Sequence, residues 1–198
     1  MTPARADLFG NAPDKSRTVV LLIDVINDLD FPGADALLAQ ALPMAKQIAS
    51  LKQRAKRASV PCIYVNDNFG RWRSDFRALV SHCLDAGVRG RPLAQLLRPD
   101  EDDYFVLPMH SGFYSTSLSL LLKHLGAQTL VLTGLSTNNC VLFTANDAYM
   151  RGFRLIIPSD CVASNTREEN DYALKQMSTV LKAEVLAADA ICFEDLPS

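Results

Sequence analysis

The sequence predicts a single α/β domain in which a six-stranded parallel sheet lies between two layers of helices. Short apolar runs alternate with longer amphipathic runs along the whole chain, the pattern of repeated strand–helix units. Some of the short runs are almost continuously apolar, as in TVVLLIDV at 18–25, which is typical of a parallel strand covered on both faces. We expect one domain over residues 1–198, with residues 1–17 as an N-terminal extension.

The first half of the chain is expected to hold two strands and two helical regions. TVVLLIDV predicts the first strand, and the run at 34–58 has helical periodicity, although Pro43 should kink it or divide it into two helices. PCIYVND at 61–67 predicts the second strand, and SDFRALVSHCLDAG predicts a helix that ends at Gly87. The segment 87–103, with its Arg, Pro and acidic residues, is expected to be a surface excursion.

The second half continues the alternation to the end of the chain. Strands are predicted at YFVLP (104–108), TLVLTG (129–134), RLIIPSD (154–160) and AEVLAADAIC (183–192). Helices are predicted at SLSLLLKHLG (117–126), CVLFTANDAYMRG (140–152) and REENDYALKQMSTVL (167–181).

Composition and charge exclude several classes of partner. Hydrophobic residues make up 48% and charged residues 21%, which indicates a globular chain rather than a disordered one. A net charge of −2 gives no general attraction to nucleic acid, and no apolar stretch reaches the length that crosses a membrane, so neither is expected as a partner. Five cysteines without a CxxC pair suit a reducing cytoplasm better than a disulfide framework.

The candidate site lies where the predicted strands end. In an open parallel sheet, ligands bind beyond the carboxyl ends of the strands. Polar side chains follow the apolar runs at these points and should converge on one edge: Asp24, Asn27, Asp28, Asp30, Asn66, Asp67, Asn68, His110, Ser111, the segment 134–140, Ser159 and Asp160. A carboxylate is costly to bury unless it is paired or chemically useful, so Asp24 is either the cap of a turn or a functional group.

Cys140 is the candidate nucleophile because it stands at the start of a predicted helix. The free amides and the dipole of a first helical turn favour thiolate over thiol, and we expect the group to be exposed at the edge of the sheet. Asp24 could then act as its base. The alternative is that Cys140 fills the core, as cysteines commonly do. That alternative fits Cys62, Cys83 and Cys192 better.

Four stretches, in this order, resemble the isochorismatase-like cysteine hydrolases: VVLLIDVINDL, SGFYSTSLSLLLKHLG, LVLTGLSTNNCVLFTANDAYMRGF and IIPSDCVAS. The resemblance implies a six-stranded parallel sheet and hydrolysis of C–N bonds in small amides, ureides or carbamoyl compounds. It also implies Asp24 as base, Cys140 as nucleophile, and an oxyanion hole formed by the amides of Ser136 and Cys140. A cis peptide at Leu135–Ser136 and a homodimer or homotetramer are further implications.

The third member of the family triad, a lysine, has no counterpart in this sequence. The family pattern resembles Lys-Pro-x-x-Ser-x-Phe, whereas this chain reads YFVLPMHSGF. Either Leu107 replaces the lysine, or one residue is missing between Leu107 and Pro108. The Lys-Pro spacing favours the second alternative, and Lys123 lies at the far end of the next predicted helix.

The segment after the second strand is informative about metal binding and about the substrate pocket. Metal-dependent members of the family place histidines there, and this chain has none before His82, so we expect no metal and no other cofactor. The walls of a pocket for a small-molecule substrate are expected from Phe31, Asn68, Phe69, Trp72, His110 and Phe113. Core packing is the alternative for each aromatic ring. Arg71 or Arg73 could hold a substrate carboxylate.

The sequence leaves three candidate functions. The first is a cytoplasmic cysteine hydrolase of a small C–N substrate. The second is a catalytically silent homologue that binds a small ligand or a protein partner, an alternative that the missing lysine supports. The third, a flavodoxin-like nucleotide binder, lacks a glycine-rich phosphate loop after the first strand.

Overall fold

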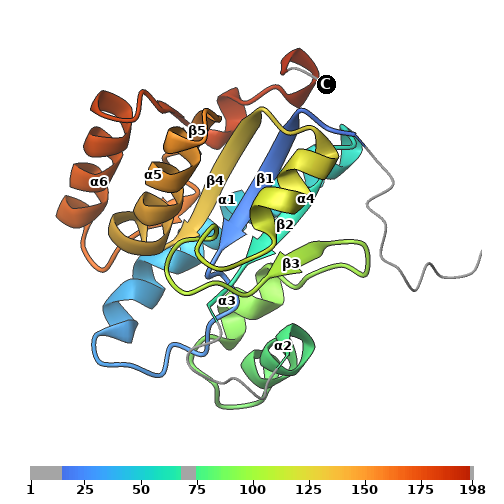
Figure 1. Cartoon of the computed structure of the whole chain (residues 1–198). Helices are drawn as coiled ribbons and strands as arrows, with labels where there is room; N and C mark the ends of the chain where they lie inside the picture. Colours follow the sequence, from blue (N-terminus) through green and yellow to red (C-terminus); the bar gives the residue numbers. More distant parts are fainter. Residues whose placement is uncertain (1–14, 68–74, 197–198) are drawn as a thin grey trace, which may run out of the picture.

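A computed structural model of the chain, which describes residues 15–67 and 75–196, confirms the three-layer α/β/α architecture with a parallel sheet (Figure 1). The main path of the sheet has the order β3-β2-β1-β4-β5-β7, and every pair along it is parallel. Its strands are β1 (Thr18–Ile23), β2 (Cys62–Val65), β3 (Tyr104–Val106), β4 (Thr129–Leu135), β5 (Arg154–Pro158) and β7 (Glu184–Leu186). A two-residue strand that was not predicted, β6 (Val162–Ala163), pairs with the end of β4.

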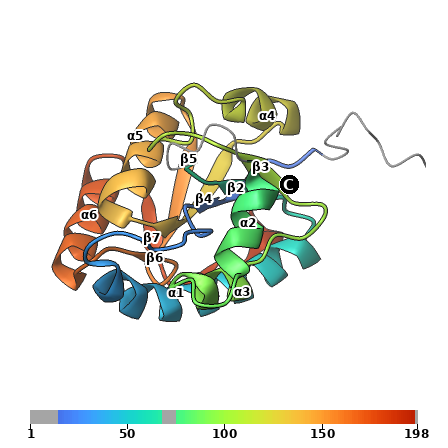
Figure 2. The ribbon, with the colours of Figure 1, turned by 90° about the horizontal axis from the view of Figure 1, so that it is seen from below.

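Six α-helices in the described residues cover the two faces of the sheet (Figures 1 and 2). One face packs against α1 (Ala34–Arg57), α2 (Phe76–Leu84) and α3 (Arg91–Leu96). The other face packs against α4 (Leu118–Leu125), α5 (Leu142–Met150) and α6 (Arg167–Thr179). Among the helices that the structure describes, none combines the length and the apolar character needed to cross a membrane.

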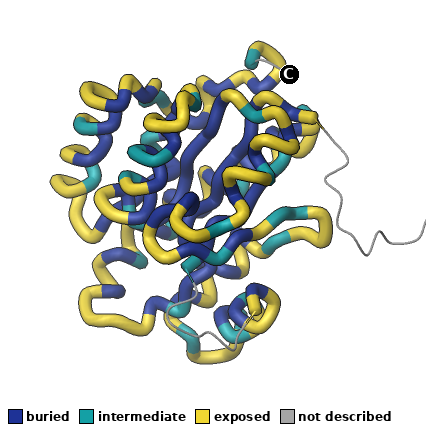
Figure 3. Tube along the Cα trace, viewed as in Figure 1, coloured by how far each residue is buried: buried dark blue, intermediate teal, exposed yellow. Residues whose placement is uncertain are grey.

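Strand β1 contributes side chains to the hydrophobic cores on both faces of the sheet. All six of its residues are buried (Figure 3). Because successive side chains of a strand point to opposite faces, Val20 and Leu22 join the core under α1, whereas Leu21 and Ile23 join the core under α4 and α5. The continuous apolar run therefore results from two buried faces, as the sequence predicted.

Pro43 lies inside one uninterrupted helix, which corrects the expectation of two helical pieces. A proline removes a single backbone donor from the helix. Buried side chains on both sides of it, among them Leu37, Ala41, Met44 and Ile48, fix the helix against the sheet. Packing over the length of α1 therefore outweighs the local preference of the proline.

Three further boundaries differ from the prediction. Helix α3 occupies the middle of the segment that was expected to be a surface excursion, and it buries Leu93 and Ala94. Helix α2 ends at Leu84 rather than at Gly87, because Asp85 is already extended. The last strand covers only 184–186 and is followed by short 3₁₀ turns.

Residues 15–17 of the predicted extension are attached to the domain. The Ser16 amide donates to the carbonyl of Leu125 over 2.9 Å, and Lys15 Nζ donates to the carbonyl of His124 over 2.7 Å. Both carbonyls lie at the end of α4. The packed part of the chain therefore begins slightly before β1.

Candidate active site

Asp24 stands at the carboxyl end of β1, directly after the last strand residue. Its side chain is buried, with 6% of the residue exposed, and its backbone has a φ of 50°. The backbone amide of Asp24 donates to the carbonyl of Val65 over 2.9 Å. The amide of Asp67 donates to Asp24 Oδ1 over 2.6 Å. A left-handed non-glycine residue is uncommon, so the turn after β1 is held in an unusual shape around this carboxyl group.

Asn66 holds the turn that follows Asp24. Its carboxamide accepts a hydrogen bond from the Ile26 amide over 3.0 Å and donates to the Ile26 carbonyl over 2.8 Å. Asn66 is fully buried, so these bonds satisfy both ends of its carboxamide. The pair ties the end of β2 to the loop after β1, and it places the Asp67 amide next to Asp24.

Gly134 lets β4 approach β1 beside Asp24. Its φ is 112°, and a Cβ atom at this position would lie 1.9 Å from the carbonyl oxygen of Ile23. No other residue type fits without moving one of the strands. The glycine of the polar segment after the fourth strand is therefore needed for the distance between the two halves of the site.

Cys140 lies in a π-helical turn, Thr137–Val141, which we call the cysteine turn and which runs directly into α5. The carbonyl of Ser136 accepts hydrogen bonds from the amides of Asn139 and Val141, at 3.0 and 3.2 Å. The sequence predicted an ordinary helix start here. Single π turns inserted in helices occur frequently at functional sites.

The expected cis peptide at Leu135–Ser136 is wrong, because this bond is trans. β4 continues through Leu135, and Ser136 keeps an extended backbone with φ −86° and ψ 144°. The chain bends only when it enters the cysteine turn.

The structure places Cys140 beside Asp24. Each of the two side chains shifts the pKa of the other. Burial raises the pKa of Asp24 to about 7, although the hydrogen bonds from Cys140 and from the Asp67 amide act in the opposite direction. The carboxyl group therefore exchanges its proton near neutral pH.

The expectation of an exposed thiolate at Cys140 is wrong for the resting site. Only 8% of the residue is exposed. Burial, followed by the negative charge and the hydrogen bond of Asp24, raises the pKa of the thiol well above its ordinary value. These effects outweigh the amides and the dipole of the helix start.

Cations are missing from the surroundings of this pair in the described residues. The charges that shift the pKa values of Asp24 and Cys140 come from carboxylates, namely Asp67 and Asp24 itself. Lys52, a buried lysine, instead binds Asp103 in front of β3, at the opposite edge of the sheet. Among the described residues, no cation contributes to the pKa shifts of Asp24 or Cys140.

The predicted walls of the pocket are described only in part. Phe31 is 38% exposed in the loop before α1. His110 is exposed, and its ring centroid lies 6.3 Å from that of Phe143. Asn68, Phe69 and Trp72, together with Arg71 and Arg73, lie outside the described residues.

Phe113 is buried in the core under α4 and α5. The guanidinium of Arg151 lies 4.7 Å from its ring centroid, and the ring of Phe153 lies 6.1 Å away. This is the packing that we considered as the alternative for each aromatic residue. Its contact with a substrate stays a prediction.

Candidate metal ligands gather elsewhere. In the described part of the chain, one group of three potential ligands is found, formed by Asp100, Asp102 and Asp103. Lys52 and Lys56 form ion pairs with these carboxylates. The group lies before β3, at the end of the strand opposite to the side where Asp24 lies, and two lysines already pair with its three carboxylates.

Some contacts around the site had no signal in the sequence. Thr137 Oγ1 donates to Oδ1 of Asn170 on α6, and Ser164 Oγ donates to Oδ1 of Asn138. Thr137 and Asn138 are part of the polar segment that drew attention to Cys140. Asn170 lies inside an amphipathic run, and only the tertiary structure reveals its partner.

Comparisons with known proteins agree with this fold. A family model described as "Isochorismatase domain" matches residues 18–190. An uncharacterized isochorismatase family protein of Bacillus subtilis is 38% identical over 178 residues, which are 89% of this chain and 97% of that protein. The maleamate amidohydrolase of Pseudomonas putida is 26% identical over 92% of this chain and 87% of its own length. The N-carbamoylsarcosine amidase of Thermoplasma acidophilum superposes with a TM-score of 0.67 and 26% identity, covering 89% of this chain and 99% of its own.

Proposed function

Because the chain belongs to the isochorismatase family, we propose that it is a cysteine hydrolase that cleaves the C–N bond of a small amide, ureide or carbamoyl compound. The observation that carries the proposal is the burial of Cys140 beside Asp24, where each group shifts the pKa of the other. A thiol beside a carboxyl group that exchanges its proton near pH 7 is a nucleophile with a base in contact. The maleamate amidohydrolase and the carbamoylsarcosine amidase among the relatives support the choice of bond.

In the proposed reaction, ionised Asp24 takes the proton of the Cys140 thiol as the sulfur attacks the substrate carbonyl. The oxygen of the tetrahedral intermediate accepts hydrogen bonds from the amides of Ser136 and Cys140. Asp24 then gives its proton to the leaving nitrogen, which departs as ammonia or an amine and leaves a thioester on Cys140. Water attacks the thioester with Asp24 again as base, and the acid leaves as the thiol re-forms.

The test is a panel of amides, ureides and carbamoyl compounds with ammonia release as the readout. We expect one class to be hydrolysed, and we expect Cys140→Ala and Asp24→Asn to abolish the reaction. Intact-mass measurement of quenched reactions should find the acyl group on Cys140. Turnover that survives in Cys140→Ala would contradict the proposed nucleophile.

A second candidate function has one observation in its favour, the lack of a cation beside Asp24 in the described residues. In this alternative, the chain is a catalytically silent homologue that binds a small ligand or a protein partner in the inherited pocket. A compound from the panel that raises the melting temperature, without ammonia release at any pH, would select this alternative.

We further propose a homodimer or homotetramer in a reducing cytoplasm. Exposed apolar side chains around the loop before α4 and along α5 support an interface with a second copy, namely Met109, Tyr114, Phe143 and Met150. All five cysteines are free, which supports a reducing compartment. Light scattering that finds a monomer at micromolar concentration would contradict the assembly.

A further inference from the structure

The cysteine turn is held from outside by a second helix. π-helical turns are rare and occur mostly as single turns, frequently at functional sites. Thr137 is fully buried at the first position of the turn, and its hydroxyl donates to Asn170 Oδ1 over 2.6 Å. Asn170 belongs to α6, 33 residues away along the chain.

The next residue of the turn is attached to the strand on the same side. Ser164 Oγ donates to Asn138 Oδ1 over 3.0 Å, and the Asn138 amide donates to Ser164 Oγ over 3.4 Å. Ser164 directly follows β6, which pairs with the end of β4. Two consecutive residues of the turn are therefore fixed to α6 and to the end of β6, and Cys140 at its fourth position meets Asp24.

We propose that Asn170 is a positioning residue, which holds the cysteine turn through Thr137 where Cys140 can pass its proton to Asp24. This inference rests on the proposed hydrolase function. Asn170 needs no contact with substrate for this role, because it acts through the Thr137 hydroxyl. Loss of the bond should let the turn relax towards an ordinary helix and move the sulfur away from the carboxylate.

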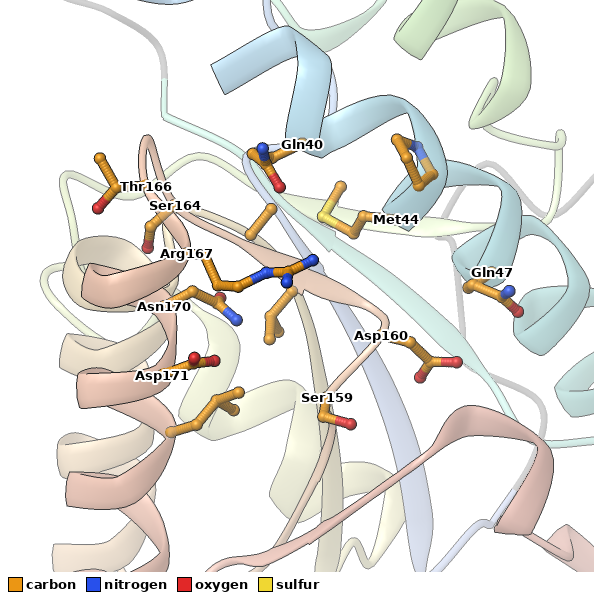
Figure 4. Close-up of a pocket in the computed structure, with 14 residues that line it drawn as sticks. Gln40, Met44, Gln47, Ser159, Asp160, Ser164, Thr166, Arg167, Asn170 and Asp171 are labelled. Carbon is orange, nitrogen blue, oxygen red and sulfur yellow. The ribbon is translucent and has the colours of Figure 1, made fainter. Parts of the chain in front are cut away.

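The surroundings of Asn170 allow its role to be tested by mutation. Asn170 and Ser164 line an open hollow of about 420 Å³ between α1, the segment 159–164 and α6 (Figure 4). The space left when the Asn170 side chain is truncated is therefore continuous with this hollow, and no enclosed cavity forms. The capping box of α6, formed by Thr166 and Glu169, is untouched by the change.

The experiment compares Asn170→Ala and Thr137→Val with two controls. Thr137→Ser keeps the hydroxyl, and Asn165→Ala removes the same kind of side chain from an exposed position close to Ser164. Hydrolysis gives kcat and KM. The rate of Cys140 alkylation by iodoacetamide between pH 6 and pH 10, followed by peptide mapping, gives the state of the thiol without any need for substrate.

In Asn170→Ala and Thr137→Val we expect kcat to fall about tenfold or more, with KM within about twofold of the parent. Alkylation of Cys140 at pH 8 should become about threefold faster or more, because the thiol loses its carboxylate neighbour and ionises more readily. A general loosening of the fold would also accelerate labelling of the buried Cys62, Cys83 and Cys161. Thr137→Ser and Asn165→Ala should stay near the parent in both assays.

An unchanged alkylation profile of Cys140 in both Asn170→Ala and Thr137→Val would overturn the inference, whatever happens to turnover. If the parent chain hydrolyses nothing, the alkylation profiles still decide the positioning role, and the function proposal fails separately. If Asn170→Ala does not fold, the contrast between Thr137→Val and Thr137→Ser decides it.

Discussion

Buried carboxylates at the two ends of the parallel strands have different partners. We call these ends the carboxyl edge and the amino edge of the sheet. At the carboxyl edge, Asp24 is buried with a thiol and a backbone amide as partners, and burial raises its pKa to about 7. At the amino edge, Asp103 is buried against Lys52, and their side chains are 3% and 9% exposed. The hydrogen bond from Lys56 holds the pKa of neighbouring Asp100 below its ordinary value.

The difference lies in a nearby cation, which buried Asp103 has and which does not contribute to the pKa shift of Asp24 in the described residues. Asp100 and Asp103 stay with their lysines in an ion-pair network that joins α1 to the segment before β3. Asp24 gains and loses a proton in the range where an enzyme works. One edge is therefore suited to stability, and the other to proton transfer.

Removing the cation from the amino edge should have the largest effect on stability. Lys52→Met removes the nearer of the two ammonium groups that pair with buried Asp103, and we expect a loss of about 4 kcal/mol in the free energy of unfolding. Urea unfolding at pH 7 measures this loss. Lys56→Met is the matched control because Lys56 is more exposed than Lys52. Its close ion pairs go to exposed Asp100 and Asp102, whereas Asp103 lies 3.8 Å away, and the change should cost about 1 kcal/mol or less. Equal losses in both variants would contradict the distinction.

Adding a cation at the carboxyl edge, near Asp24, should increase the activity of the protein. A lysine inserted between Leu107 and Pro108 follows β3 at the same edge as Asp24. Two negative charges about 4 Å apart repel by roughly 4 kcal/mol at an effective dielectric constant near 20, which an ammonium group would offset. We expect kcat/KM for ammonia release to rise by about a hundredfold to a thousandfold.

A methionine inserted at the same position is the control for the change in loop length. It should leave the rate of ammonia release at the level of the parent chain. If the methionine raises the rate as much as the lysine does, loop length and not charge limits the parent. Full activity of the parent, with no gain from either insertion, would show that the site works without a third group.

Asp24 should also give the protein a measurable dependence of stability on pH. Its pKa is higher in the folded state than in the unfolded chain, so its contribution to stability is complete at low pH and is lost as pH rises through about 7. Between pH 5 and pH 8 we expect a loss of roughly 2.5 kcal/mol that is absent from Asp24→Asn. Parallel pH profiles for the two proteins would contradict the raised pKa. In catalysis, the same group should give kcat/KM a rising limb near pH 7.

The sequence predicted the parts of the molecule that depend on local patterns. Apolar runs located the strands because parallel strands are buried on both faces, and the shared direction of the strands predicted that residues after them meet at one edge. The structure places Asp24 and Cys140 together there. Their catalytic roles stay predictions.

The parts that were missed depend on contacts between distant segments. The π turn is held by Asn170 and Ser164, which lie 33 and 26 residues from their partners in the turn. Pro43 remains helical because α1 packs along its whole length. The low exposure of Cys140 arises only when β1 and β4 are side by side, which no window of sequence around the cysteine reveals.

Gly134 has a consequence for how this protein tolerates mutation. Any side chain there would press on the Ile23 carbonyl and push β4 away from β1, so that Asp24 and Cys140 would separate. In a saturation screen for activity, position 134 should be as intolerant of substitution as Asp24 and Cys140, although it has no side chain to offer. Loss of activity on substitution of Gly134 would result from misalignment of β1 and β4. It would not indicate that Gly134 takes part in the reaction.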